Sequence, residues 1–182
     1  SNIELVYGLN EFFTNQVKTQ ANQKLKLTID DKENSETQID FNFDDENSVL
    51  LDDIEIVANE NTKSTIIIKY TSNEDIEGFH NGIIRVNAKQ NSNVKIILVN
   101  LMNTKSNNFM AIENTFEANA KVDYTIVDFG GKNSITNYYG CNVRVFCCGS
   151  TYEECKDLLM KNLKEKEDKK LHSSVVKVNY YH

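Results

Sequence analysis

The residues best suited to chemistry are a group of cysteines near the C-terminal end. Four lie in the last quarter of the chain, at Cys141, Cys147, Cys148 and Cys155. Their spacing matches neither a C-x2-C pair nor a familiar zinc or ferredoxin pattern. Adjacent residues of a strand point to opposite faces, so Cys147 and Cys148 are poorly placed to share one metal. We therefore expect buried or incidental thiols, with transient sulfur or iron–sulfur ligation as the alternative.

A histidine and several carboxylates are the other candidates. His80 is the only histidine outside the C-terminal tail, and it stands in the segment Gly78-Phe79-His80-Asn81-Gly82. We place it in a turn, where a single histidine is more often a hydrogen-bonded structural residue than a ligand. Four carboxylates could supply an acidic pair for glycoside chemistry, although solvated loop residues are the simpler interpretation. They are Asp44, Asp45, Asp52 and Asp53.

Composition excludes several classes of partner. The chain has 182 residues, a net charge of −7 and a pI near 5.0, so we expect no nucleic-acid surface. Its longest apolar runs are far below the roughly 20 residues of a membrane helix, so we expect no membrane partner. The cysteines are not spread through the chain as in a disulfide-stapled secreted protein, and we identify no signal peptide at its start. A cytoplasmic protein is the expectation.

The elements that must position these residues are short strands. A polar stretch, an asparagine and a β-branched strand recur along the chain, and the leading asparagines are 27, 30 and 28 residues apart. They are Asn34, Asn61, Asn91 and Asn119. Each interval holds about two strands, and no helical pattern intervenes. This pattern predicts a parallel β-solenoid with asparagines hydrogen-bonded along its corners, and an antiparallel sandwich with Asn-rich turns is the alternative.

The two ends of the chain predict different elements. A helix is expected from residue 9 to about 23, and one more strand at 143–147. A second helix, over 150–169, is expected to cap the last coil or to serve as a docking element, and an edge strand follows at 173–182. The sequence thus predicts a single domain over 1–182, with a β-helix core at 25–148 and a C-terminal helix and edge strand at 149–182.

About two thirds of the chain, over roughly residues 25–140, resembles a known family. The segments that carry the resemblance are 54–63, 79–82, 108–109, 119–122 and 130–138. The Phe-His-Asn-Gly segment and the Gly-Gly-Lys segment, in that order and separation, are its most specific parts. The chain resembles the SufB/SufD family, the β-helical scaffold proteins of Suf iron–sulfur cluster assembly.

The resemblance implies a right-handed parallel β-helix and a non-enzymatic role. It implies two partners, a SufC-like ABC ATPase and a SufB/SufD-type protomer in a homo- or heterodimer. It also raises a transient iron–sulfur cluster as a possible cofactor, with Cys147, Cys148 and His80 as candidate ligands. The family's own cluster residues fall in a stretch that this chain lacks, so none is transferred. A β-helical carbohydrate-active enzyme and a generic protein-interaction module are the alternative functions.

Overall fold

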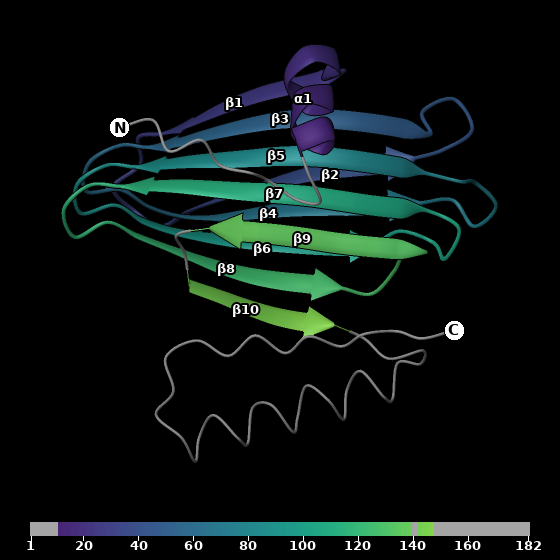
Figure 1. Cartoon of the computed structure of the whole chain (residues 1–182). Coiled ribbons are helices and arrows are strands. Elements are labelled where there is room, and N and C mark those ends of the chain that lie inside the picture. The colour runs from purple at the N-terminus through teal and green to yellow at the C-terminus, as the bar shows by residue number, and fades with distance from the viewer. Residues whose placement is uncertain (1–10, 140–141, 148–182) are drawn as a thin grey trace.

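Parallel strands wound into two sheets make up most of the described structure (Figure 1). The computed structural model describes residues 11–139 and 142–147. Sheet A contains, in order, β1 (Gln23–Ile29), β3 (Val49–Ala58), β5 (Phe79–Ala88), β7 (Asn107–Phe116) and β9 (Asn133–Tyr139). Sheet B contains β2 (Ser35–Phe43), β4 (Lys63–Ser72), β6 (Asn93–Leu101), β8 (Lys121–Asp128) and β10 (Asn142–Cys147).

The connectivity of these strands makes the chain a parallel β-helix. Consecutive strands alternate between the two sheets, so one strand from each sheet makes one coil. Each strand pairs in parallel with the strand two places along the chain. The predicted solenoid is confirmed, and the antiparallel sandwich is wrong. A coil cannot cover its own inward face, so the stacked coils bury one another.

The interior of the coil is filled mainly by aliphatic side chains from alternate strand positions. Their residues align across neighbouring coils, as Ile54 does with Ile84 and Ile66 with Ile96. Burying an isoleucine side chain stabilises the fold by about 1.5–3 kcal/mol. The fully buried isoleucines are Ile54, Ile56, Ile66, Ile68, Ile84, Ile96 and Ile112.

Asparagines form the corners after the sheet A strands, as predicted. Asn61, Asn91 and Asn119 have φ angles of 61°, 59° and 59°, a left-handed conformation that asparagine tolerates. The Asn91 side chain donates to Asn61 Oδ1, and that of Asn119 donates to Asn91 Oδ1, each at 3.1 Å. The prediction is wrong for Asn34. Because Ser35 pairs with Ser64, the first coil is longer than the asparagine spacing implies, and Asn34 falls two residues past the equivalent corner.

One helix, α1 (Glu11–Gln20), packs on the outer face of sheet A. Its Val17 is fully buried against Ile83 and Ala111. The helix is shorter than predicted at its C-terminal end. The Asn22 side chain instead bonds the backbone of β3, accepting from Leu51 N and donating to the Val49 carbonyl. The chain therefore leaves the helix and enters β1 directly.

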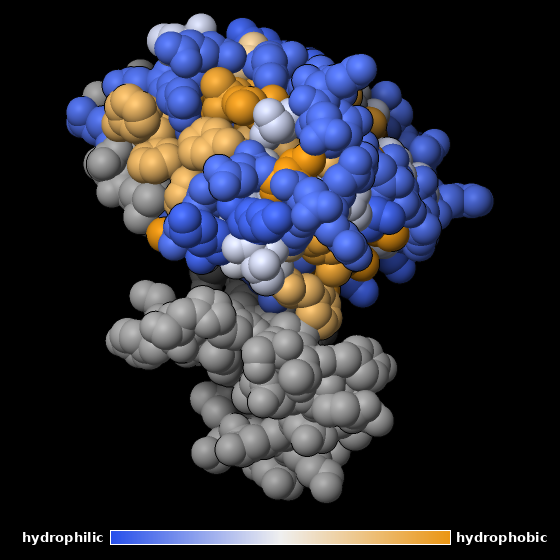
Figure 2. All heavy atoms as spheres, turned by 90° about the vertical axis from the view of Figure 1, so that its right-hand side faces the viewer, coloured by the Kyte–Doolittle hydropathy of each residue, from blue (hydrophilic) through white to orange (hydrophobic). Residues whose placement is uncertain are grey.

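Aromatic rings gather where α1 meets sheet A. The Phe109 ring lies 4.8 Å from Phe13 and 5.8 Å from Phe79, measured between ring centroids. Phe12, at the edge of this cluster, is 66% exposed. Figure 2 shows apolar side chains on the left of a corner face that is otherwise mainly hydrophilic.

The predicted strand at 143–147 is confirmed as β10. The helix predicted over 150–169 and the edge strand predicted at 173–182 lie outside the described residues. The division of the chain at residue 149 therefore stays a prediction. None of the helices in the described ranges has the length and apolar character needed to cross a membrane.

Candidate functional site

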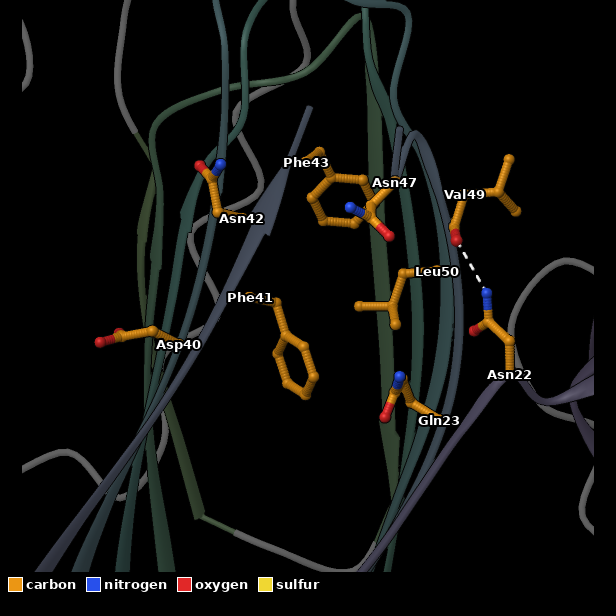
Figure 3. A pocket seen from close by; sticks show the side chains of 9 residues that line it. All are labelled: Asn22, Gln23, Asp40, Phe41, Asn42, Phe43, Asn47, Val49 and Leu50. Carbon is orange, nitrogen blue, oxygen red and sulfur yellow. Dashed lines mark hydrogen bonds between the residues drawn. The ribbon is translucent and has the colours of Figure 1, made fainter. Parts of the chain in front are cut away.

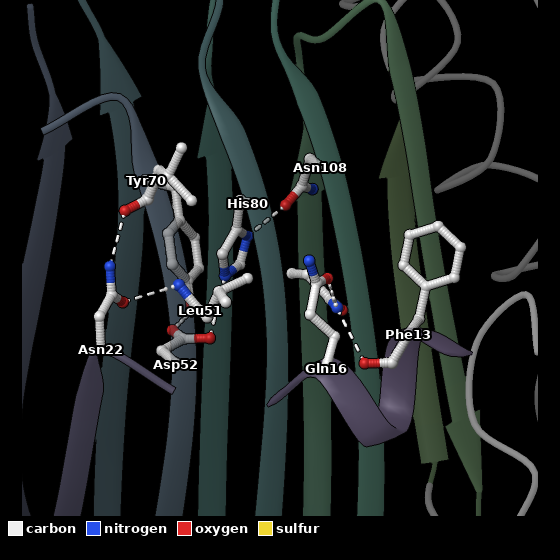
Figure 4. A network of polar contacts seen from close by, with 10 residues as sticks. Phe13, Gln16, Asn22, Leu51, Asp52, Tyr70, His80 and Asn108 are labelled. Atoms are coloured by element: carbon white, nitrogen blue, oxygen red, sulfur yellow. Dashed lines mark hydrogen bonds and ion pairs between the residues drawn. The ribbon is translucent and has the colours of Figure 1, made fainter. Parts of the chain in front are cut away.

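His80 lies at the centre of a buried polar network (Figure 4). It is fully buried in β5, so the predicted turn at this position is wrong. Its ring is hydrogen-bonded, as predicted. Its Nε2 lies 3.0 Å from Asp52 Oδ1, and its Nδ1 lies 2.6 Å from Asn108 Oδ1. Both ring nitrogens are therefore occupied by neighbouring side chains.

The partners of Asn108 fix the direction of these hydrogen bonds. Its amide nitrogen donates to Ser134 Oγ at 3.0 Å, which leaves its oxygen for His80. The Nδ1 of His80 must then carry a proton. On the other side of the ring, one proton lies between Nε2 and the Asp52 carboxyl group, whichever of the two holds it. The histidine thus links its own coil to the coil on either side through directional bonds.

A glycine inside β5 makes room for this contact. Gly82 pairs with Asp52 in the register of the sheet. A Cβ atom at Gly82 would lie 2.0 Å from Asp52 Oδ1 and 2.7 Å from His80 Nε2. Glycine in a strand interior is otherwise unfavourable, and it often marks a close approach of this kind. Gly82, one of the two glycines that suggest a turn around His80, therefore opens space for a buried carboxylate instead.

Tyr70 completes the surroundings of Asp52 from sheet B. Its hydroxyl donates to Asp52 Oδ2 at 2.9 Å, and its ring stacks on His80 with centroids 4.2 Å apart. Burial, followed by the nearby charge of Asp52, holds the pKa of Tyr70 well above its ordinary value. The phenol therefore stays protonated and remains a donor. Both Asp52 oxygens are satisfied in this way.

The network continues from Asn108 to sheet B. Ser134 donates to Asp128 Oδ2 at 2.5 Å, and the Asn100 amide donates to Asp128 Oδ1 at 2.8 Å. Burial raises the pKa of Asp128, and the hydrogen bonds from Ser134 and Asn100 partly oppose that rise. Seven side chains thus form one hydrogen-bonded set, which we call the polar column. Its members are Asp52, Tyr70, His80, Asn100, Asn108, Asp128 and Ser134.

The strand register explains why the polar column is continuous. His80, Asn108 and Ser134 occupy one row of sheet A, paired in that order. Tyr70, Asn100 and Asp128 occupy one row of sheet B, also paired in that order. The two rows face each other across the interior. A cavity of about 10 Å³, the space of one water molecule, is lined by Asn108 of the first row and by all three residues of the second.

The polar column is suited to holding coils together rather than to binding a solvent-borne ligand. His80 and Asp52 are inaccessible, and their hydrogen-bonding groups are used by one another. Among residues 11–139 and 142–147, no group of three His, Cys, Asp or Glu side chains is arranged to hold a metal ion. Buried polar groups that are fully paired rigidify a core and specify its register.

The cysteine candidates lie elsewhere. Cys147 ends β10, and its backbone pairs with that of Asp128 in β8, so it follows the polar column in the sheet B register. His80 belongs to sheet A, whereas Cys147 belongs to sheet B. Cys141, Cys148 and Cys155 lie outside the described residues.

The carboxylates considered for glycoside chemistry do not form an exposed acidic pair. Asp52 is buried against His80, and Asp53 forms an ion pair with Arg85 on the outer face. Asp44 accepts from the backbone amides of Glu46 and Asn47, which caps a turn. Asp44, Asp52 and Asp53 thus have structural partners, and Asp45 is an exposed residue of the loop after β2.

Sequence reasoning missed most of the polar column. The sequence indicates only a solvated acid at Asp52, and it includes Asn108 and Ser134 only in the segments that carry the family resemblance. The repeat of about 28 residues is the feature of the sequence from which this polar row can be predicted. Asn108 lies 28 residues after His80 and pairs with it, whereas Asp52 lies 28 residues before His80 and pairs with Gly82. A polar residue that recurs at the solenoid period, on the inward side of its strands, indicates an interior polar row.

Comparison with known proteins agrees with this architecture. The family model described as SUF system FeS cluster assembly, SufBD core domain, matches residues 41–142. This match covers more than half of the chain and includes every member of the polar column. Searches of curated proteins and of solved structures found no match. The extent of the family match and the parallel β-helix beneath it lead to one conclusion: the chain belongs to the SufBD core-domain family of Suf iron–sulfur cluster assembly.

Proposed function

We propose that this chain is a non-enzymatic, cytoplasmic scaffold in Suf iron–sulfur cluster assembly. In this proposal it partners a SufC-like ABC ATPase and a SufB/SufD-type protomer. The observation that carries the proposal is the family match over residues 41–142, which spans the coils held by the polar column. A role in Suf assembly follows from the family, and the partners and the absence of catalysis are the proposed part.

The interior chemistry supports a scaffold. Asp52, His80 and Tyr70 inside the described coils hydrogen-bond one another, and His80 also bonds Asn108. Groups committed in this way keep the coils in register instead of reacting with a substrate. A closely packed interior transmits strain because it is not easily compressed. Such a body suits a protein that must hold partners while an ATPase changes shape.

The ATPase partnership is tested with the full chain and the Suf ATPase of the same genome. The two purified proteins are mixed under reducing conditions with ATP and separated by size exclusion with mass detection. We expect a complex whose mass accounts for both proteins. An ABC ATPase subunit taken from an unrelated transporter is the control and should elute separately. Separate elution of the Suf ATPase, with the scaffold folded, would count decisively against the proposal.

A transient cluster is tested separately, with Cys147 and Cys148 as the proposed thiolate ligands. His80 is a poorer candidate, since both of its ring nitrogens already have partners. Anaerobic reconstitution with iron and sulfide should produce visible absorption in the wild type, and this should fall in Cys147→Ser and Cys148→Ser. Cys155→Ser is the matched control and should retain the absorption. If no protein develops absorption, the cluster proposal is wrong and the scaffold role depends on partners alone.

A further inference from the structure

Helix α1 covers only part of the apolar outer face of sheet A. Its Val17 packs on Ile83 and Ala111. Beside them, Ile135 of β9 is 38% exposed, and Phe109, its pairing partner in β7, is half-buried. These two side chains and three further rings form a continuous surface, which we call the aromatic face. Its members are Phe12, Phe13, Phe79, Phe109 and Ile135.

The start of α1 is fixed at the aromatic face. The Asn81 side chain in β5 donates to the Phe13 carbonyl at 2.9 Å and to Gln16 Oε1 at 2.8 Å (Figure 4). These bonds hold the first turns of the helix on the sheet. Since α1 begins at Glu11, the ten residues that precede it in this chain join the helix beside the aromatic face.

The sequence of those ten residues suits an apolar surface. Every second residue from position 3 to position 9 is apolar, which places four side chains on one side of an extended segment. Extended over these positions, the segment is about 23 Å long, whereas β5 and β9 are only about 10 Å apart across the sheet. The segment is therefore long enough to cross the aromatic face. The four residues are Ile3, Leu5, Tyr7 and Leu9.

A buried hydroxyl on α1 also points to a contact with the preceding residues. Thr14 is only 6% exposed, and its Oγ1 has no hydrogen-bond partner among the described residues. Buried polar groups nearly always have a partner. Inside a helix, a threonine hydroxyl donates to the carbonyl four residues earlier, which for Thr14 is that of Asn10. The missing partner is thus expected in the segment that precedes Glu11.

The first coil is the other place where such a segment could lie. It has a cavity of about 210 Å³, and five of its nine lining residues carry a carboxamide or a carboxylate (Figure 3). The cavity adjoins the far end of α1, about 15 Å from its start. The aromatic face is nearer and wholly apolar, so it is the better match. The five polar lining residues are Asn22, Gln23, Asp40, Asn42 and Asn47.

We propose that residues 3–9 of this chain pack on the aromatic face as an extended segment, with their four alternate apolar side chains toward its rings. The aromatic face is then an internal contact of the chain, closed by its own N-terminal segment. This goes beyond the proposed function, because it removes an apolar surface from those on which a partner protein could dock.

Tryptophan fluorescence of the full chain tests the contact. The chain contains no tryptophan, so a single introduced indole reports only on its own surroundings. In Tyr7→Trp, and separately in Leu9→Trp, we expect blue-shifted emission and weak quenching by acrylamide, as for an indole removed from water. Indoles that are exposed in both variants of a folded chain overturn the inference.

A charge on the aromatic face tests where the segment lies. In the Tyr7→Trp chain, Ile135→Glu should raise the fraction of molecules with a released segment about tenfold, measured as stronger quenching. Leu101→Glu, at a side chain of β6 that is 45% exposed, is the matched control and should leave the quenching unchanged. An indole that is buried but insensitive to Ile135→Glu lies elsewhere, as on the first coil, and this also overturns the inference.

Two neighbouring residues test the orientation of the segment. Leu5→Ser in the Tyr7→Trp chain should raise the released fraction about tenfold, because it removes one apolar side chain from the contact. Val6→Ser, the same kind of change on the opposite side, should have much less effect, and equal effects contradict the extended arrangement. Circular dichroism checks that the coils stay folded. Binding of the Suf ATPase is not a readout here, so this inference and the proposed function fail independently.

Discussion

The interior of the β-helix has two halves built on different physical principles. In one half, isoleucines such as Ile54, Ile56 and Ile84 stack across the coils and are fully buried. In the other half, the polar column crosses the same coils through hydrogen bonds, with His80 between Asp52 and Asn108. Both halves occupy inward positions of the same strands. The apolar half fills the interior of the solenoid, and the polar half fixes the register of its coils.

Apolar packing depends on volume and area, so it tolerates many exchanges of similar size. A hydrogen bond depends on direction, and its loss leaves a buried donor or acceptor without a partner. The polar half should therefore be far more sensitive to small chemical changes than the apolar half.

Asp52→Ala should destabilise the protein most. It removes the partner of His80 Nε2 and of the Tyr70 hydroxyl, both of which are buried. Breaking a buried pair in this way costs about 3–5 kcal/mol in the free energy of unfolding, measured by urea denaturation. The neighbouring Asp53→Ala is the control. It breaks an ion pair with the partly exposed Arg85, which is expected to cost less than about 1 kcal/mol. Equal losses in the two variants would remove the distinction between the interior and the surface.

Gly82→Ala should cost about 3 kcal/mol, at the upper end for overpacking, since its Cβ would collide with both Asp52 and His80. Urea denaturation measures the change. In the Asp52→Ala background the same substitution should cost much less, because the nearer of the two colliding groups is gone. Additive effects of the two substitutions would show that Gly82 does not make space for Asp52.

Tyr70→Phe should cost about 2 kcal/mol, because the hydroxyl donates to a carboxyl group that no water can reach. Tyr124→Phe provides the comparison, since its hydroxyl donates to the neutral amide oxygen of Asn114. That variant should lose only about 1 kcal/mol. The difference in thermal unfolding midpoint between the two variants measures the effect, and a larger loss in Tyr124→Phe would contradict it.

Ile84→Val tests the apolar half. It removes one methylene group from a fully buried side chain without leaving a polar group unpaired. The expected loss is about 1 kcal/mol by urea denaturation. A loss as large as that of Asp52→Ala would mean that the two halves do not differ in sensitivity.

Asp128 should give the smallest effect, as a dependence on pH. Its folded-state pKa is raised above 3.8, so the folded protein binds this proton more tightly than the unfolded chain. The contribution of Asp128 to stability is then greatest below pH 3.8 and falls as the pH rises through the raised pKa. Compared with Asp128→Asn, the wild type should lose stability over that interval. A wild type that gains stability relative to the variant on raising the pH would reverse the assigned direction.

The sequence predicts the repeating framework better than the chemistry inside it. The corner residues Asn61, Asn91 and Asn119 indicate the coils because a left-handed corner selects asparagine repeatedly. The place of His80 could not be predicted in the same way. Gly82 resembles a turn residue in sequence, and only the register shows that it faces Asp52. The predicted corner at Asn34 is wrong for a similar reason, because strand pairing, which the sequence does not show, sets the length of the first coil.

The proposed scaffold role requires that the polar column hold the coils together and stay closed to solvent. The chain has three histidines, of which His80 lies in the described residues, and its imidazole signals can be assigned by comparison with a His80→Gln variant. Nitrogen-15 NMR of the ring then tests the claim directly. The account predicts a proton on Nδ1 that exchanges slowly with solvent, since it is buried against Asn108. Rapid exchange of that proton in the folded protein would contradict the account, because it would mean that the ring is open to solvent.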